Sequence, residues 1–391
     1  MRAIPEMVHE LFFRSAARYP DYPCLGFAGE DTLSYSQVSE LVDALSFRLA
    51  ADGIAPGARV AIIGENMPNW GVAYLAVNRC GGIAVPILPD FSISDITTIM
   101  RHAGVTACFF SGRYGEKAAS CGLGSGTVFY SLDTLGRVCA PGPEPTPFTV
   151  QPDTGPTAEG LEKQGFQHHG RAGDTAVLVY TSGTTGHSKG VMLSNANLIF
   201  DVTKVSTIPR VTAGETFLSI LPLAHTYECT VGFLSPLSMG LNISYLRRPP
   251  SATVLMPALK RVRPHLVLSV PLLIEKLYRQ SILPTFQSNR FYKRIYANRI
   301  GRKILNRMAG RKMLRAFGGR LYFFGIGGAP PSPDIEEFMR EARFPYCVGY
   351  GLTETSPVLA AAHPRDMRPR STGKPIEGIE IRIDDQGHGT A

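Results

Sequence analysis

A run of glycine and small hydroxyl residues, T-S-G-T-T-G-H-S-K-G at Thr181–Gly190, has the composition of a phosphate-binding loop. Glycines let a backbone come close to an anion, and hydroxyl and free N–H groups donate hydrogen bonds to phosphate oxygens. The run follows T-A-V-L-V-Y (Thr175–Tyr180), which is typical of a buried strand. The sequence therefore predicts a strand that ends in a phosphate cradle, and the alternative is an ordinary Gly/Ser/Thr turn.

The cradle differs from the P-loop of common NTPases, whose pattern is G-x-x-x-x-G-K-[ST]. Five residues separate Gly183 from Lys189, and Gly190 follows the lysine where the P-loop has serine or threonine. A different nucleotide chemistry is therefore indicated.

Length and composition limit the class of protein. The chain has 391 residues, 44% of them hydrophobic and 18% charged, so we expect a globular protein with about two or three lobes. The seven cysteines form no C-x-x-C pair, which favours a reducing, cytoplasmic setting. Glu6 and Glu10 interrupt any export signal, and the apolar stretch 217–246 is broken by Pro222, Glu228 and Pro236, which excludes a spanning helix there.

The positive charge is local. The whole chain carries 40 basic and 32 acidic residues, a net charge of +8, but Arg290–Arg320 alone holds eleven basic residues and no acidic one. Without that segment the chain has 29 basic and 32 acidic residues, a net charge of −3. A general nucleic-acid-binding surface is therefore not supported.

The elements around the cradle alternate between strand and helix. Val38, Leu41, Val42, Leu45 and Leu49 have helical spacing, and Gly53 and Pro56 would end that helix. A predicted strand at 59–63, a helix at 69–79 and a strand at 83–88 follow, which is the order of a parallel sheet covered by helices. Residues 137–174 contain six of the prolines and are predicted to be a linker.

Four further stretches, together with the cradle, identify a family. Y-T-S-G-T-T-G-H-S-K-G-V-M-L-S (Tyr180–Ser194), L-P-L-A-H-T-Y-E (Leu221–Glu228), G-G-A-P-P-S (Gly327–Ser332), G-Y-G-L-T-E-T-S-P-V (Gly349–Val358) and S-T-G-K-P-I-E-G (Ser371–Gly378) resemble the motifs of the adenylate-forming superfamily of acyl-CoA synthetases and luciferases. Ser188, Asn195 and Pro331 stand where proline, histidine and leucine are usual there. The resemblance covers essentially the whole chain.

The resemblance implies a fold and a division of the chain. It implies an α/β protein with two mostly parallel sheets, flanking helices and a smaller β-rich lobe. We expect all of 1–391 to be an AMP-binding N-terminal domain with a first α/β region at 1–136, the linker at 137–174, a nucleotide- and acyl-binding α/β region at 175–358, and the start of the β-rich lobe at 359–391.

The resemblance also implies roles for individual residues. Glu354 would hold Mg²⁺, Thr353 would donate to the α-phosphate of ATP, and Lys189 would add charge near the cradle. His225 would stand as a wall or gate between nucleotide and acid. The residues implied to surround the phosphates and the adenine are Thr181, Ser182, Gly183, Thr184, Thr185, Gly186, Gly327, Gly328, Ala329, Tyr350 and Gly351.

Each of these side chains taken alone has a structural alternative. Glu354 could be a carboxylate that favours a helix dipole, Tyr350 a core aromatic, and His225 a loop histidine with satisfied hydrogen bonds. Only the joint pattern favours the functional roles.

The substrate implied by the resemblance is a long-chain fatty acid, activated with ATP and passed to coenzyme A. The segment Arg290–Arg320 mixes basic residues with Phe291, Tyr292, Ile295, Tyr296, Ile300, Ile304 and Leu305 at near-helical spacing. Such a helix could lie on an anionic membrane, giving a peripheral location, and the alternative is a solvated helix packed on its own domain.

The family normally continues into a mobile C-terminal domain that admits coenzyme A, and the chain stops before it. We therefore expect weak binding of Mg-ATP or AMP, very poor acyl-adenylate formation and no acyl-CoA synthesis. The leading prediction is the large domain of a long-chain fatty acid–CoA ligase. The alternatives are a ligase for an aryl or medium-chain acid and a non-catalytic nucleotide- or acyl-binding protein.

Overall fold

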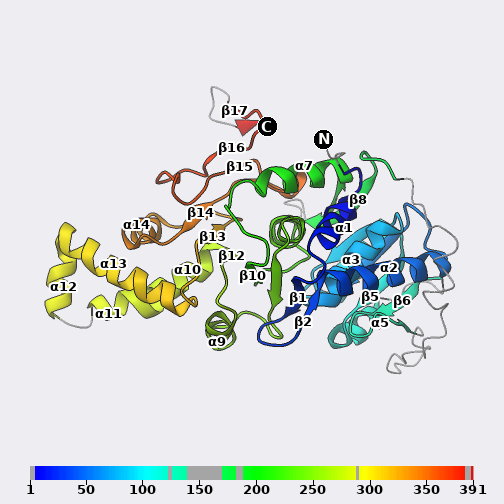
Figure 1. The fold of residues 1–391 in the computed structure, drawn as a ribbon, viewed down its shortest axis with the longest axis horizontal. Coiled ribbons are helices and arrows are strands. Elements are labelled where there is room, and N and C mark those ends of the chain that lie inside the picture. The colour runs from blue at the N-terminus through cyan, green and yellow to red at the C-terminus, as the bar shows by residue number, and fades with distance from the viewer. Residues whose placement is uncertain are drawn as a thin grey trace.

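The computed structural model describes residues 5–121, 126–138, 170–181, 188–287, 290–383 and 389–390. Two seven-stranded sheets dominate these residues (Figure 1). Sheet A has the strand order β14 (Tyr346–Val348), β13 (Phe323–Ile326), β12 (Leu266–Ser269), β10 (Thr216–Ser219), β11 (Asn242–Tyr245), β1 (Pro23–Phe27) and β2 (Thr32–Ser34). Sheet B has the order β7 (Arg137–Val138), β6 (Val128–Ser131), β5 (Val105–Phe110), β3 (Arg59–Ile63), β4 (Ile83–Ile87), β8 (Thr175–Thr181) and β9 (Lys189–Ser194).

Both sheets are mostly parallel, as expected. In sheet A only β1–β2 is antiparallel, and in sheet B only β6–β7 and β8–β9 are. Strands from distant parts of the chain share each sheet, because β1 and β2 join sheet A while β8 and β9 join sheet B. The expected division at residues 136 and 174 therefore crosses both sheets, and it stays a prediction.

Helices between the sheets form the largest core. These are α1 (Val8–Arg18), α2 (Tyr35–Ala51), α3 (Pro68–Arg79), α7 (Asn195–Val205) and α8 (Ser235–Ser238), with a π-helical turn η3 (Glu228–Leu234). Alternate residues of a strand point to opposite faces. Val60 and Ile62 of β3 accordingly enter this central core, whereas Ala61 and Ile63 enter the core on the outer face of sheet B.

The outer faces carry the remaining helices. Sheet B is covered by α4 (Ile93–Ala103) and α5 (Gly115–Ser120), next to the short η1 (Gly112–Tyr114). Sheet A is covered by α9 (Ala252–Val262), α10 (Pro271–Leu277), η4 (Tyr278–Ile282), α13 (Arg299–Ala316) and α14 (Pro333–Ala342). The result is five alternating layers of helix and sheet.

The predicted local elements agree closely with the structure. The helix expected around Val38–Leu49 is α2, which begins at a capping box formed by Ser34 and Gln37. The strand and helix predicted at 59–63 and 69–79 are β3 and α3, and the strand predicted at 83–88 is β4. Most of the predicted linker lies outside the described residues.

The basic segment Arg290–Arg320 is helical but is not one helix. It comprises α12 (Arg290–Ala297) and α13, and Asn298 separates them as the N-cap of α13, its side chain accepting from the backbone of Ile300. With α11 (Leu283–Gln287), these helices project at the end of the molecule opposite α2 and α5 (Figure 1).

Two short antiparallel strand pairs follow the stretch Gly349–Val358. β15 (Ala360–Ala361) pairs with β16 (Lys374–Pro375), and β17 (Arg382–Ile383) pairs with β18 (Gly389–Thr390). They lie together beside the C-terminus (Figure 1), where the sequence predicts the start of a β-rich lobe. Within the described residues, no helix is long and apolar enough to cross a membrane.

Candidate functional site

The predicted phosphate cradle connects two paired strands. Thr181 ends β8 and lies opposite Lys189, the first residue of β9. Lys189 is exposed and Thr181 is half-buried. The predicted cradle residues Ser182, Gly183, Thr184, Thr185 and Gly186 lie outside the described residues, so the structure places only the two ends of the cradle.

The stretch Gly349–Val358 follows β14 and forms a tight loop. The N–H of Tyr350 donates to the carbonyl of Ala360 (2.8 Å), and the N–H of Leu359 donates to the carbonyl of Tyr350 (2.8 Å). Between these two bonds lies the short 3₁₀ turn η5 (Thr353–Thr355). The Thr355 hydroxyl oxygen accepts from the N–H of Leu352 at 2.9 Å, which fixes the start of that turn.

The loop lies against β9, the strand that follows the cradle, although some 160 residues separate the two motifs in the sequence. Strand β9, which begins at Lys189, contacts η5, which contains Thr353 and Glu354. Two of the predicted motifs, one from each sheet, therefore share one place in the fold.

The predicted side chains of the loop are open to a ligand. Tyr350 is 45% exposed, Glu354 is exposed and Thr353 is half-buried. Tyr350 is therefore not a core aromatic. The three residues of η5 leave almost no helix macrodipole for Glu354 to favour, since that dipole is a sum over many peptide units.

A second loop, at the end of β13, carries the predicted adenine-side residues. The N–H of Gly327 donates to the carbonyl of Ser269 (3.1 Å), and Gly328 has a φ of +82°, a conformation that glycine adopts readily. Gly328 and Ala329 are exposed. Gly327 and Gly349 follow neighbouring parallel strands. Both loops therefore lie at the carboxyl ends of the strands of sheet A.

The stretch Leu221–Glu228 contacts this second loop through Tyr227. A Cβ on Gly327 would lie 2.8 Å from the Tyr227 ring, so only glycine fits there without a shift. His225 precedes Tyr227 and keeps an exposed surface, yet partial burial lowers its pKa. The neutral form of His225 is therefore favoured at pH 7.

Asn66 holds the same stretch from the other side. Its Nδ2 donates to the Leu221 carbonyl (2.6 Å) and to the Ser219 hydroxyl (3.0 Å), and its Oδ1 accepts from the N–H of Leu223 (2.9 Å). The Ser219 hydroxyl in turn donates to the buried Glu228 carboxyl (2.6 Å). Burial raises the pKa of Glu228 to about 8, so this carboxyl is held largely protonated at pH 7.

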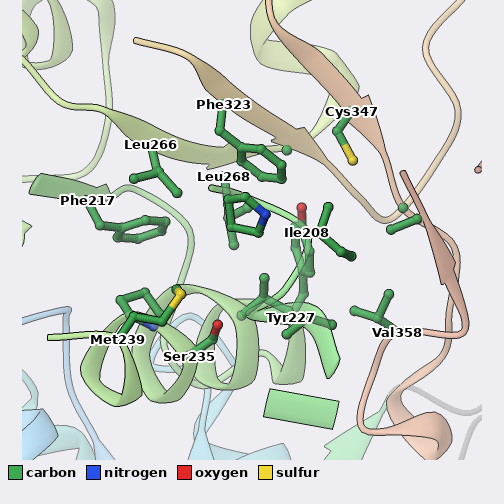
Figure 2. A pocket seen from close by; sticks show the side chains of 17 residues that line it. Ile208, Phe217, Tyr227, Ser235, Met239, Leu266, Leu268, Phe323, Cys347 and Val358 are labelled. Carbon is green, nitrogen blue, oxygen red and sulfur yellow. The ribbon is translucent and has the colours of Figure 1, made fainter. Parts of the chain in front are cut away.

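A small apolar cavity lies beside these loops (Figure 2). It has a volume of about 50 Å³ and lies between sheet A and the helical layer of α7, η3 and α8. Tyr227 lines it on the side of η3, and Gly325, Gly349 and Val358 line it next to the two loops. Its lining also includes the side chains of Phe217, Met239, Leu266, Leu268 and Phe323.

Glu354 is the carboxylate that the sequence singles out for a metal. Within the described residues Glu354 forms no ion pair, and no three His, Cys, Asp or Glu side chains gather closely enough to hold a metal by themselves. An exposed carboxylate oxygen suits Mg²⁺, which usually takes one or two protein carboxylates and completes its shell with water and substrate phosphates.

Comparison with known proteins adds a family to this geometry. The model of the AMP-binding enzyme family matches residues 12–390. The chain belongs to this family. Among curated members, the chain is 26% identical to "Long chain acyl-CoA synthetase 6, peroxisomal" of Arabidopsis thaliana, over 97% of this chain and 57% of that protein. It is also 26% identical to "Long-chain-fatty-acid--CoA ligase FadD15" of Mycobacterium bovis, over 90% of this chain and 61% of that protein.

Solved structures of AMP-binding enzymes have the same fold. The N-terminal domain of FACL13 from Mycobacterium tuberculosis superposes with a TM-score of 0.75 at 17% identity, over 99% of this chain and 86% of that one. The AMP complex of o-succinylbenzoate CoA synthetase from Bacillus subtilis has a TM-score of 0.69 at 19% identity, over 97% of this chain and 84% of that one. The chain spans about three fifths of the length of the two curated relatives.

Sequence reasoning missed three residues that shape these loops. Tyr227 lies two residues after His225, inside a stretch that the resemblance singled out. The sequence could therefore have indicated it as a site residue. Asn66 and Ser269 gave no signal, because their contacts join segments far apart in the chain.

Asn195, which stands where histidine is usual, accepts from the N–H of Val8 (3.0 Å) and thereby ties α1 to α7.

Replacing Gly351 with alanine is expected to open the loop of η5. A Cβ on Gly351 would lie 1.6 Å from the Pro357 carbonyl oxygen, so the loop has to move, and overpacking of this kind typically costs about 1–3 kcal/mol. Hydrogen–deuterium exchange at Tyr350 and Leu359 should rise in Gly351→Ala. Gly126→Ala is the matched control, because no atom lies within 4 Å of its Cβ position. Unchanged protection in Gly351→Ala would show that the loop does not need glycine there.

Proposed function

We propose that this chain is the large domain of a long-chain fatty acid–CoA ligase, which joins a fatty acid to AMP and prepares it for transfer to coenzyme A. The observation that carries the proposal is the meeting of β9 and η5 beside an apolar cavity. That arrangement supplies a polar place for phosphates next to an apolar place for an acid. The names of the curated relatives point to the same substrates.

The reaction needs positioning and charge compensation rather than a catalytic base. A fatty acid carboxylate is already ionised at pH 7, so it can attack the α-phosphorus of ATP directly while pyrophosphate leaves. The protein has to bring two anions together in line, which otherwise repel each other. Residues that donate hydrogen bonds or carry positive charge are therefore what such a site requires.

Each predicted residue has a task in this proposal. Thr353 donates to the α-phosphate, Lys189 and Thr181 face the β- and γ-phosphates with the cradle, and Tyr350 and Gly351 pack on the adenine opposite the backbone of Gly327, Gly328 and Ala329. Glu354 would hold Mg²⁺, which when bound would supply compensation for the phosphate charge. His225 is neutral at pH 7 and separates the nucleotide from the acid. A neutral imidazole does not form an ion pair with the carboxylate of the acid.

The cavity is the proposed start of the acyl site. Its lining is almost wholly apolar, which suits a hydrocarbon chain and disfavours a polar acid. Its volume of about 50 Å³ is well below the ~300–1,000 Å³ of ordinary ligand pockets. A long acyl chain therefore needs the side chains that line the cavity to move. The small volume is the one observation that favours the alternative of a medium-chain or aryl acid.

Transfer to coenzyme A is proposed from the relatives alone. The division into regions at 1–136, 137–174, 175–358 and 359–391, with coenzyme A admitted by a further domain, likewise remains part of the proposal.

Binding of nucleotide and of acyl-adenylate analogues tests the proposal. Calorimetry should detect Mg-ATP binding to the chain, and Glu354→Gln should weaken it at least tenfold because the metal loses its carboxylate ligand. Glu40→Gln is the matched control, since Glu40 is exposed on α2, away from η5. A series of acyl sulfamoyl adenosines should bind more tightly as the acyl chain lengthens from two to sixteen carbons. Tightest binding at short chains would favour the alternative acid, and no binding of ATP or any analogue would refute both.

We further propose that α12 and α13 touch an anionic membrane, which would give a peripheral location on the cytoplasmic side. Ile300, Ile304 and Met308 of α13 are 72%, 55% and 57% exposed and recur every four residues along one face. Lys303, Arg307 and Arg311 form an adjacent row with the same spacing. An exposed apolar row beside a basic row is typical of helices that lie in a lipid interface.

Part of the basic segment has a structural task instead. Arg302 forms ion pairs with Glu337 (2.7 Å) and the buried Glu341 (3.0 Å), both on α14. Leu305 and Met313 are buried, and Met313 packs in the core on the outer face of sheet A. Only the outward face of α13, together with α12, is therefore available to lipid.

Vesicle co-sedimentation tests this contact. Binding to phosphatidylcholine vesicles that contain 30% phosphatidylglycerol should fall at least tenfold in Lys303→Glu/Arg307→Glu, because each basic residue near such a surface contributes about 1 kcal/mol. Arg101→Glu/Arg113→Glu, on the outer face of sheet B, is the control. Equal binding of both double variants would contradict the contact, as would stronger binding to an oligonucleotide than to the vesicles.

A further inference from the structure

A basic groove follows the free edge of sheet A and adjoins the site described above. It consists of two adjoining hollows of about 800 and 450 Å³, which share Arg210 and His363. Their walls come from the loop after α7, the turn between α14 and β14, and the chain that follows β15. We call this feature the β14 groove.

The charge of the β14 groove is strongly one-sided. The larger hollow is lined by four arginines and no carboxylate, and the smaller one adds Arg368 and Lys374 with a single acid, Asp366. The four arginines are Arg210, Arg340, Arg343 and Arg365. Among the described residues, only Arg340 of these four has a carboxylate within ion-pair distance, and that contact, to Glu337, is long at 4.0 Å.

Two nearby acids, Glu215 and Glu336, bind other groups. Glu215 accepts from the Tyr322 hydroxyl (2.5 Å), and Glu336 accepts from the Tyr346 hydroxyl (3.2 Å) and from the N–H of Arg370 (3.0 Å). Tyr322 and Tyr346 line the larger hollow, whereas Glu215 and Glu336 do not. The four arginines are exposed to solvent.

His363 reports the same crowding of positive charge. It lies where the two hollows meet, and its Nδ1 accepts from the N–H of Arg365 (3.2 Å). Partial burial lowers its pKa, Asp366 opposes that effect, and the charges of Arg210 and Arg365 lower it further. Like charges held together in this way are unfavourable unless an anion joins them.

The groove also has an apolar floor. Leu314, Leu321, Phe344 and Met367 line its larger hollow beside the rings of Tyr322 and Tyr346. A surface of this kind can pack against the organic part of a ligand while the guanidinium groups bind its charges.

The smaller hollow of the β14 groove shares Ile208 and Ala361 with the apolar cavity. The larger hollow is separate from the site of η5. Its residues Phe344, Pro345 and Tyr346 lie where β14 begins, whereas Gly349 and Tyr350 lie where β14 ends. The chain returns along the edge from β15 to His363, so the two places lie on opposite ends of the same strand. A ligand in the larger hollow would therefore not occupy the place proposed for ATP.

We propose that the β14 groove binds a small soluble organic molecule that carries two or more phosphate groups. Guanidinium groups bind phosphate oxygens in pairs of parallel hydrogen bonds, which explains why arginine and not lysine dominates the wall. Several arginines spread over two adjoining hollows match several phosphates better than one. The aromatic and aliphatic floor accommodates the rest of the molecule.

Pyrophosphate is the probe for the charged part of this site. Phenylglyoxal modifies accessible arginines, and mass spectrometry locates each modified side chain. Pyrophosphate should protect Arg343 and Arg365 at least tenfold more than sodium chloride of the same ionic strength, and should leave Arg101 on α4 unprotected. Calorimetry should show that Arg343→Gln/Arg365→Gln lowers the affinity for pyrophosphate at least tenfold relative to Arg101→Gln.

A second pair of variants separates this site from the proposed ATP site. Lys189→Gln/Glu354→Gln should lose Mg-ATP binding and keep the pyrophosphate protection of Arg343 and Arg365, whereas Arg343→Gln/Arg365→Gln should do the reverse. Loss of that protection in the Lys189/Glu354 variant, or no protection in any protein, would overturn the groove as a phosphate site. Protection by phosphatidylglycerol vesicles but not by pyrophosphate would overturn the soluble ligand. Each result leaves the test of ATP binding unaffected.

Discussion

The contact between β9 and η5 is the constraint on which the candidate site depends, because it joins the two sheets at the ends that carry the predicted motifs. β9 belongs to sheet B and η5 follows the edge strand of sheet A. The helices α1, α2, α3 and α7 fill the space between the sheets and fix their separation. The packing of a large apolar core thus determines how η5, which contains Glu354, lies against the strand that begins at Lys189.

Two polar arrangements stabilise the loops at this junction. Asn66 satisfies three polar groups of the stretch around Leu221–Leu223, so that stretch does not need water inside the protein. Glycine at 327 and 351 allows the Tyr227 ring and the Pro357 carbonyl to approach the backbone closely. The loops are therefore shaped by contacts from residues that need not touch a ligand, while exposed Tyr350 and Glu354 remain available to bind one.

The sequence was informative wherever the signal was local. The period of Val38–Leu49 and the apolar runs of β3, β4 and β8 predicted elements that the structure contains, because burial of one face or of a whole strand determines them. The motifs predicted the loops after β13 and β14. The pairing of β1 and β2 with sheet A, the clamp of Asn66 and the β14 groove all depend on contacts between distant segments, which no local pattern encodes. The break at Asn298 was equally unexpected, since the apolar spacing continues across it.

Photoaffinity labelling with 8-azido-ATP, followed by mass spectrometry of the labelled peptides, tests the central claim most directly. The account predicts that the label is found on peptides that contain Tyr350 and the loop Gly327–Ala329, and that excess ATP prevents the labelling. Labelling confined to other peptides, such as those of the β14 groove, would contradict the claim that the junction of β9 and η5 is where this protein binds its nucleotide.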